Sequence, residues 1–247
     1  MIGAERQSRV AIVTGGSRGL GRAIATRVAG DGFAVIVNYR REEEAAAATV
    51  GSIIAAGGRA AEVQGDVARP DDVKALFDRA EAMFGGVDVV VNCAGIMTVK
   101  PLADYDLSAF DAMVSTNVRG TFLVSQQAAR RVRPGGAIIN MSTSAERQAM
   151  PGYGPYAMTK GAVEGLTMVL AREMKGRNIT VNAIAPGPTA TDGFLNGKSA
   201  ELVARIADLN PFGRIAEPLE IAEIVAFLIG TGRWINGQVI FANGGMN

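Results

Sequence analysis

Five short apolar runs rich in β-branched residues recur along the chain and predict buried strands. They are VAIVT (10–14), AVIVN (34–38), VDVVVN (87–92), AIINM (137–141) and ITVNAIA (179–185). The runs are continuous rather than alternating, which is typical of strands that are buried on both faces of a parallel sheet. Segments with helical periodicity separate the runs. We therefore expect an α/β chain with a doubly wound fold and helices on both faces of the sheet.

The predicted helices carry recognisable end signals. The segment 21–32 ends in glycine, the segment 42–58 opens with acidic residues and closes on glycines, and the segment 70–86 begins with proline and acidic residues. Residues 187–218 are less regular, with PGPTATDGF and LNPFGRIAEP around one short helical segment, and they have the position of an active-site lid. Because the chain contains no linker or repeat, we expect one domain over residues 1–247, with the lid at about 187–218.

Composition narrows the function classes. The chain has 247 residues, 48% of them hydrophobic, which is enough for a sizeable core. The net charge is +1 and the basic residues are spread along the chain, so the one-sided basic surface of a nucleic-acid binder is not expected. The N-terminus lacks the pattern of a signal peptide and no apolar run is long enough for a bilayer, so we expect a cytoplasmic protein without a membrane partner. With Cys93 alone and no histidine, we expect no metal site and an inert, buried thiol.

A glycine-rich turn, TGGSRGLG, follows the first predicted strand and opens a helix at residues 14–21. Glycine permits positive φ angles and a close approach of the backbone to a pyrophosphate at the helix N-terminus. The spacing of Gly15, Gly19 and Gly21 differs from the commoner dinucleotide fingerprint, and many such turns hold glycine for geometry alone. The strand-turn-helix context nevertheless favours a dinucleotide site.

The end of the second predicted strand indicates which dinucleotide is bound. Binders of NAD usually place an acidic residue there, which accepts a hydrogen bond from the ribose 2′-hydroxyl. Here the strand ends in Asn38, followed by Tyr39, Arg40 and Arg41. The guanidinium groups of Arg40 and of Arg18 in the glycine turn can pair with a 2′-phosphate, so NADP(H) is favoured over NAD(H). The alternative, that these arginines only solvate a strand end, applies to Arg41 more than to Arg40.

A chain without histidine needs another group for proton transfer, and Tyr156 with Lys160 offers one. On a helix, residues four apart lie on the same face. Lowering the pKa of a phenol from about 10 to about 7 requires about 4 kcal/mol. One cation at about 4 Å supplies about that much at an effective dielectric constant of about 20, before desolvation subtracts from it. Lys160 alone is therefore marginal, and a positive nicotinamide ring nearby would add to the shift.

Six motifs follow one another in an order that carries a resemblance. They are TGGSRGLG, NCAG (92–95), TNVRG with Asn117, STS (142–144), YAMTK (156–160) and PGPTAT (186–191). From roughly Ser8 to Gly245 the chain resembles the short-chain dehydrogenase/reductase family, and it is similar to 3-oxoacyl-[acyl-carrier-protein] reductases. The resemblance implies a single Rossmann domain around a seven-stranded parallel sheet, and NAD(P)(H) as cofactor.

The resemblance also implies the roles of individual residues. Asn117, Ser144, Tyr156 and Lys160 would form the catalytic set, in which Ser144 and Tyr156 bind the substrate carbonyl and Tyr156 protonates it. Lys160 would bind the nicotinamide ribose, and Asn117 would hold a water that links this lysine to solvent. The serine is ambiguous: Ser142, Thr143 and Ser144 are all available, and Thr143 lies at the spacing commoner in the family, but Ser144 is our choice.

The predicted binding sets are larger. The cofactor set comprises Gly15, Ser17, Arg18, Gly19, Leu20, Gly21, Asn38, Tyr39, Arg40, Asp66, Val67, Asn92, Ala94, Gly95, Tyr156, Lys160, Pro186, Gly187, Thr189 and Thr191. Ser144, Met150 and Tyr153 are expected to line the substrate pocket. Tyr153 has no lysine at the right offset, so it is not the expected acid.

These observations favour an NADPH-dependent reductase that converts a ketone or 3-oxoacyl carbonyl to a secondary alcohol. Two alternatives stay open: a dinucleotide-binding sensor or scaffold without turnover, and a sugar or polyol dehydrogenase that works in the oxidising direction. The substrate could be linked to an acyl carrier or to CoA, and Arg130 and Arg172 could contribute to a surface for such a carrier. The segments EPLEIAEIVAFLIG and GQVIFANGG resemble the subunit contacts of the family, which implies a homotetramer.

Overall fold

A computed structural model describes residues 9–246, and these form one seven-stranded parallel sheet in the order β3-β2-β1-β4-β5-β6-β7. The strands are β1 (Val10–Val13), β2 (Ala34–Tyr39), β3 (Arg59–Gln64), β4 (Val87–Asn92), β5 (Val132–Met141), β6 (Thr180–Pro186) and β7 (Val239–Ala242). The strand order reverses direction along the chain between β3 and β4, which places β1 and β4 side by side at the switch point where such folds bind nucleotides. The predicted doubly wound Rossmann fold is confirmed.

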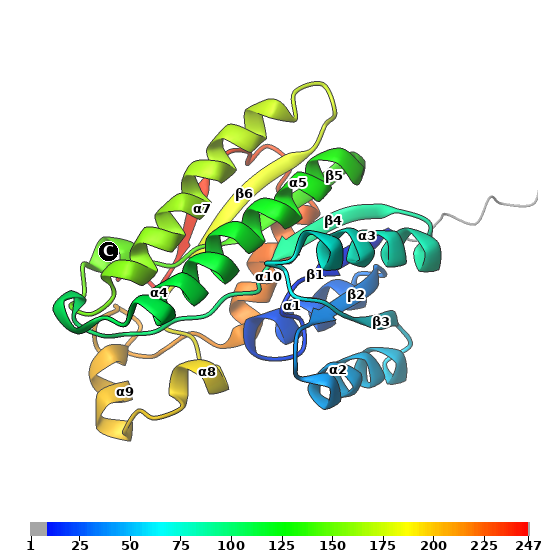
Figure 1. Cartoon of the computed structure of the whole chain (residues 1–247). Helices are drawn as coiled ribbons and strands as arrows, with labels where there is room; N and C mark the ends of the chain where they lie inside the picture. Colours follow the sequence, from blue (N-terminus) through cyan, green and yellow to red (C-terminus); the bar gives the residue numbers. More distant parts are fainter. Residues whose placement is uncertain (1–8, 247) are drawn as a thin grey trace, which may run out of the picture.

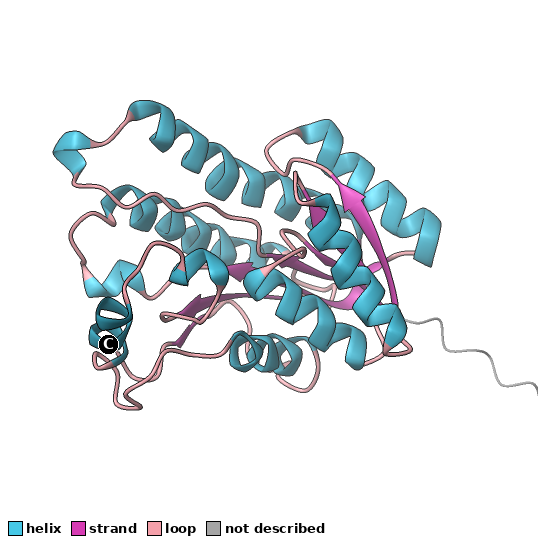
Figure 2. Ribbon diagram, turned by 90° about the horizontal axis from the view of Figure 1, so that it is seen from below, coloured by secondary structure: helices cyan, strands magenta, loops and turns pink. Residues whose placement is uncertain are grey.

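Helices cover both faces of the sheet (Figures 1 and 2). On one face lie α1 (Gly19–Gly30), α2 (Glu43–Ala55) and α10 (Pro218–Ile229), and on the other lie α3 (Pro70–Phe84), α5 (Thr121–Arg131) and α7 (Gly154–Glu173). In β1, Ala11 and Val13 belong to the first apolar core, whereas Ile12 belongs to the second. Because successive side chains point to opposite faces, both faces need apolar residues, and this explains the unbroken apolar runs.

Strand β3 was not predicted by the hydrophobic pattern. Its sequence is RAAEVQ, and among its residues only Val63 is buried. The strand forms an edge of the sheet and pairs only with β2. An edge strand with few buried positions needs no continuous apolar run, so the pattern has little signal there.

A long helical stretch between β4 and β5 changes its winding in the middle. After the short 3₁₀ turn η1 (Leu102–Asp104), α4 (Leu107–Met113) leads into the π-helical turn η2 (Val114–Gly120), which continues into α5. Asn117 lies in this π-helical turn and is fully buried. Inserted π turns are frequent at functional sites because they redirect side chains within a helix.

The segment 187–218, predicted to be a lid and called the lid below, contains two short helices, not the single helical segment expected from the sequence. These are α8 (Asp192–Leu195) and α9 (Ala200–Ala207), at the lower left of Figure 1, and the short α6 (Ala145–Gln148) precedes α7. The two ends of the lid are hydrogen bonded to each other: Ala190 N donates to Ala216 O at 2.8 Å, and Ala216 N donates to Pro188 O at 2.9 Å. The lid therefore leaves the sheet and returns to it at nearly the same place. Across residues 9–246, no helix combines the length and the hydropathy needed to cross a bilayer.

Candidate active site

Tyr156 and Lys160 lie on the first turns of α7, next to the end of β5. The Lys160 ammonium nitrogen lies 5.7 Å from the centre of the Tyr156 ring. The same nitrogen donates a hydrogen bond to the main-chain oxygen of Met141, the last residue of β5, at 2.7 Å. The strand end thus fixes the lysine, and because an amino group has further hydrogens, donors remain for another ligand.

Burial dominates the titration of this pair. It raises the pKa of Tyr156 to about 12, and an interaction with the Thr143 side chain opposes that rise. Burial also lowers the pKa of Lys160 to about 8. The protein's own groups therefore keep the phenol protonated, and Lys160 by itself does not activate it.

The hydroxyl groups after β5 have different partners. The Thr143 side chain, through its interaction with the phenol, acts to lower the pKa of Tyr156. Its Oγ1 accepts a hydrogen bond from Ala145 N at 3.2 Å. The Ser144 side chain is buried, and its Oγ accepts a hydrogen bond from Gln148 Nε2 at 3.3 Å. Of these two hydroxyls, Thr143 is the one whose interaction with the phenol affects the pKa of Tyr156.

Asn117 fastens the π-helical turn to the loop after β4. Its Oδ1 accepts a hydrogen bond from Ile96 N at 2.9 Å, and its Nδ2 donates to Ile96 O at 2.8 Å and to Thr159 Oγ1 at 3.1 Å. A Cβ atom at Gly95 would lie 3.4 Å from Asn117 Oδ1 and 3.7 Å from Lys160 Nζ. Residues far apart in the sequence thus meet at one point, although both hydrogens of the Asn117 amide are already used.

The glycine turn forms a close cradle with the loop after β4. Gly15 has a φ of 63°, and a Cβ atom there would lie 2.9 Å from Ala94 Cα. A Cβ atom at Gly21 would lie 2.1 Å from Gly15 O, so only glycine permits this turn to pack against helix α1. Thr14 Oγ1 accepts hydrogen bonds from Cys93 N and Ala94 N, both at 3.1 Å, and joins the two segments. This turn, half-buried at Gly15 and Gly19 and lying at a helix N-terminus, has the chemistry that a dinucleotide pyrophosphate requires.

Other parts of the predicted cofactor set border this cradle. A Cβ atom at Gly19 would lie 3.5 Å from Thr191 Cγ2, so the start of the lid lies against the glycine turn. Val67 packs on the π-helical turn, where a Cβ atom at Gly120 would lie 2.7 Å from Val67 Cγ2. The predicted residues therefore converge from the first half and the last third of the chain.

Two predicted cofactor residues direct their side chains into the framework of the sheet. The Asn38 Nδ2 donates hydrogen bonds to Val63 O at 3.2 Å and to Gly65 O at 3.1 Å. The Asn92 Nδ2 donates to Asn140 Oδ1 at 2.7 Å and to Ser125 Oγ at 3.2 Å. The side-chain Nδ2 groups of both residues are used to connect neighbouring elements. Any contact of these residues with a nucleotide must therefore use their other atoms.

The remaining predicted residues lie close to the same end of the sheet. Pro186 O accepts a hydrogen bond from Ser144 N at 2.9 Å, and Gly187 O accepts one from Thr189 Oγ1 at 2.9 Å. Ser17 is buried, and Leu20 and Tyr39 pack in the core that faces α1. Met150 and Tyr153 are half-buried before α7, and Tyr153 is close enough for its charge to raise the pKa of Tyr156.

The structure also assigns parts to residues that the sequence analysis did not single out. Thr14 joins the glycine turn to the loop after β4, Thr159 accepts a hydrogen bond from Asn117, and the Met141 carbonyl accepts one from Lys160. Thr14 and Thr159 each adjoin a motif, which is a weak signal, whereas a main-chain carbonyl leaves no trace in the sequence. Burial raises the pKa of the Cys93 thiol to about 11, so this group is not a ready nucleophile.

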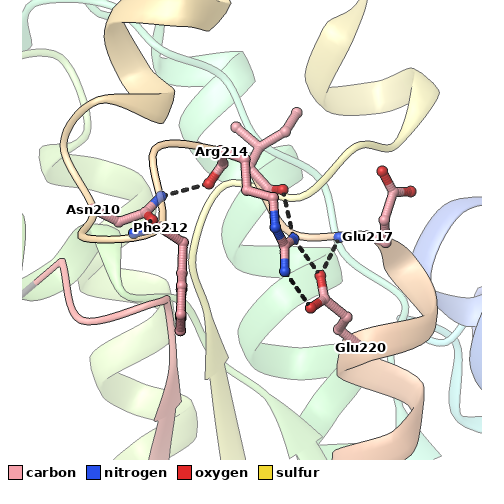
Figure 3. A network of polar contacts seen from close by, with 6 residues as sticks. Asn210, Phe212, Arg214, Glu217 and Glu220 are labelled. Carbon is pink, nitrogen blue, oxygen red and sulfur yellow. Dashed lines mark hydrogen bonds and ion pairs between the residues drawn. The ribbon is translucent and has the colours of Figure 1, made fainter.

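A polar network anchors the far end of the lid (Figure 3). Both guanidinium Nη atoms of Arg214 lie 2.7 Å from the Glu220 carboxylate, and this carboxylate also accepts a hydrogen bond from Glu217 N, the N-cap of α10, at 2.8 Å. Asn210 Nδ2 donates to Arg214 O at 2.5 Å, and Asn210 Oδ1 accepts from Phe212 N at 2.9 Å. The end of the lid is thus joined to the first turn of a core helix.

Comparison with known proteins places this architecture in a family. The family model described as enoyl-(acyl carrier protein) reductase matches residues 15–247. A protein from Arabidopsis thaliana named NADPH-dependent aldehyde reductase-like protein, chloroplastic, is 44% identical over 252 residues, which cover 96% of this chain and 93% of that protein. A short-chain type dehydrogenase/reductase from Picea abies is also 44% identical, over 96% of this chain and 92% of its own length.

Solved structures agree with this placement. A short-chain dehydrogenase from Burkholderia cenocepacia in complex with NADP superposes with a TM-score of 0.92 at 39% identity, over 98% of this chain and all of that chain. The angucycline C-6 ketoreductase LanV with bound NADP gives a TM-score of 0.91 at 37% identity, over 97% of this chain and 96% of that one. The protein therefore belongs to the short-chain dehydrogenase/reductase family and is an oxidoreductase.

Proposed function

We propose that this enzyme is an NADPH-dependent reductase that converts an aldehyde or ketone to the corresponding alcohol, with Tyr156 as the acid. The observation that carries the proposal is the position of Tyr156, whose phenol is protonated, interacts with the Thr143 side chain and lies beside Lys160. The names of the aldehyde reductase from Arabidopsis thaliana and of the ketoreductase LanV support a carbonyl substrate.

The chemistry follows from these groups. Bound NADPH would supply a hydride to the carbonyl carbon. Negative charge would then grow on the carbonyl oxygen, where the hydroxyls of Thr143 and Tyr156 donate hydrogen bonds, and Tyr156 transfers its proton to that oxygen. We propose Thr143 for this role in place of Ser144, because its hydroxyl is the one that reaches Tyr156.

Lys160 and Asn117 would support the proton transfer. The phenolate left after the reaction is stabilised by the Lys160 cation, which would also bind the ribose next to the nicotinamide. We propose that Asn117 holds a water near Lys160 through an acceptor atom, because both hydrogens of its amide already bind Ile96 O and Thr159 Oγ1. The water would return a proton from solvent to the lysine and then to the tyrosine.

The basic residues around the glycine turn support NADPH as the cofactor. Arg18 lies in the turn and Arg40 follows β2, and their side chains are 67% and 42% exposed. No acidic residue stands at the end of β2 before Arg40, where NAD binders commonly carry one. The complexes of relatives with NADP are consistent with this assignment.

We also propose that the enzyme is a homotetramer. Leu219 and Phe227 on α10 are half-exposed, and Trp234 before β7 is fully exposed. On α7, Met158, Met168 and Val169 are exposed as well. Two such apolar faces on different elements are the surfaces that a tetramer with twofold symmetry would bury, and sedimentation velocity tests this directly.

The deciding experiment measures NADPH consumption with aldehydes, acetoacetyl thioesters, aromatic diketones, quinones and keto sugars. The Tyr156→Phe variant is the blank, and we expect its turnover to be abolished while its affinity for NADPH stays nearly unchanged. Most of the activity surviving in that variant would disprove the mechanism. Oxidation of sugars or polyols with NADP⁺, without reduction of any carbonyl in the panel, would support the dehydrogenase alternative. Tight NADPH binding without turnover of any compound would support a sensor.

A further inference from the structure

The two arginines proposed to bind the 2′-phosphate of NADPH already have anionic partners. Arg18 Nη1 lies 3.4 Å from Glu42 Oε1, and Arg40 Nη1 lies 3.5 Å from Asp66 Oδ2. The two turns that carry Arg18 and Glu42 are joined, because Gly16 N donates a hydrogen bond to Asn38 O at 2.9 Å. The two ion pairs therefore lie at the carboxyl ends of β1, β2 and β3, which are neighbours in the sheet.

The two carboxylates differ in how firmly they are held. Asp66 Oδ1 accepts a hydrogen bond from Ala68 N at 2.9 Å, and Asp66 N donates to Asp72 Oδ2 at 3.0 Å. The side chain of Glu42 is 49% exposed, and within residues 9–246 its one ion pair is with Arg18, whose side chain is 67% exposed. Hydrogen bonds with the backbone and with Asp72 thus fix the position of Asp66. Among the described residues, the Glu42 side chain is held by its ion pair with Arg18.

We propose that Glu42 competes with the 2′-phosphate for Arg18 and so limits the preference of this enzyme for NADPH over NADH. The inference rests on the proposed use of NADPH. A 2′-phosphate at Arg18 must either displace the Glu42 carboxylate or lie next to this second negative charge. Both lower the affinity of the enzyme for NADPH. NADH carries no phosphate there, so the same carboxylate imposes no such penalty on it.

The size of the effect follows from the exposure of the pair. Exposed ion pairs contribute little to stability because water and salt screen them, so the competition changes affinity by a small factor. Removing the charge of Glu42 also removes a repulsion of the phosphate. We expect the ratio of the NADH to the NADPH dissociation constant to rise about fivefold in Glu42→Gln, chiefly through tighter binding of NADPH.

The experiment is an equilibrium titration of the full chain with NADPH and with NADH, followed by dihydronicotinamide fluorescence at low salt. The control is Glu44→Gln, an equal change of charge two residues further on, in the first turn of α2, at a residue that has no ion pair within residues 9–246. A ratio more than twofold above that of the control supports the proposal, and a smaller difference overturns it. In an Arg18→Ala background the effect of Glu42→Gln must shrink, since an undiminished effect would show that Glu42 does not compete for Arg18.

The same titration separates the two proposals. A wild-type chain that binds no NADPH overturns the proposed function, and this inference with it. A chain that binds NADPH, with a ratio unchanged between Glu42→Gln and its control, overturns only the competition.

Discussion

The buried side-chain nitrogen of Lys160 donates a hydrogen bond to the main-chain oxygen of Met141 at 2.7 Å. The contact fixes the amine where α7 meets the end of β5, but it cannot replace the solvation that a cation loses on burial, which is why the pKa of Lys160 falls to about 8. A residue that we propose for catalysis thus reduces the stability of the fold at neutral pH.

This cost predicts a specific pH dependence of stability. Between the folded pKa of about 8 and the usual value of 10.5, the unfolded chain binds a proton that the folded chain does not. The free energy of unfolding therefore rises with pH in that window. Below the window, Lys160 lowers the free energy of unfolding by the full amount. Relative to Lys160→Met, the wild type should gain on the order of 2 kcal/mol between pH 7.5 and 10.5. Urea unfolding of both proteins at the two pH values measures the gain, and a constant difference between them would refute it.

The second prediction concerns the Tyr156 phenol. Because burial raises its pKa to about 12, this phenol should remain protonated at pH 10 in the protein without added cofactor. Phenolate absorbance between pH 7 and 10 should therefore be the same in the wild type and in Tyr156→Phe. Adding NADP⁺ should lower the pKa of Tyr156, because a positive nicotinamide favours the phenolate. A titration near pH 8 in the protein alone, absent from Tyr156→Phe, would contradict this account.

The third prediction separates the two neighbouring hydroxyls. Thr143→Val keeps the shape of the side chain and removes the hydroxyl that reaches Tyr156, so kcat/KM should fall by about 100-fold or more, as for loss of one donor to a developing oxyanion. Ser144→Ala removes a hydroxyl that accepts from Gln148 and should lower kcat/KM by less than tenfold. The reverse order would restore Ser144 to the catalytic set. Thr143→Ser should recover most of the activity lost in Thr143→Val.

The fourth prediction tests cofactor selection through the neighbouring arginines. Arg40→Ala should weaken NADPH binding by about tenfold and change NADH binding little, because a charge-assisted contact with phosphate contributes about 1.5 kcal/mol or more. Arg41→Ala is the matched control, since its side chain belongs to the exposed turn beside Arg40. Equal weakening of NADPH and NADH in Arg40→Ala would remove Arg40 from the phosphate site.

The sequence predicts most of the framework because the signals are periodic or local. Continuous apolar runs identify β1 and β4, the spacing of four residues on a helix gives the relation of Tyr156 to Lys160, and the resemblance adds the seventh strand, β7. The hydrophobic pattern does not predict β3 because this strand lies at an edge of the sheet. It predicts only one of the two lid helices because α8 is a single short turn.

Side-chain direction is where the sequence analysis is weakest. Asn38 stands at the strand end as expected, yet its amide donates to Val63 and Gly65 in the neighbouring chain segment. Thr143 and Ser144 are adjacent in the sequence, and only the turn after β5 decides which hydroxyl meets Tyr156. Such choices depend on the backbone path after a strand, which composition and spacing do not encode.

Backbone hydrogen bonds join Pro188 and Ala190, at the start of the lid, to Ala216 at its end. This pairing has an evolutionary consequence. Since the two ends of the segment are fixed to each other, residues can be inserted or deleted between them without moving Thr189 or the start of α10. The entropy of closing a loop changes slowly with its length, so such changes have little effect on folding. We therefore expect the chain to accept segments of other lengths grafted between Thr191 and Asn210, which keeps the contact of Thr191 with the glycine turn and the contacts of Asn210 and Arg214 near α10. Substrate range should diversify in this segment while the reaction stays the same.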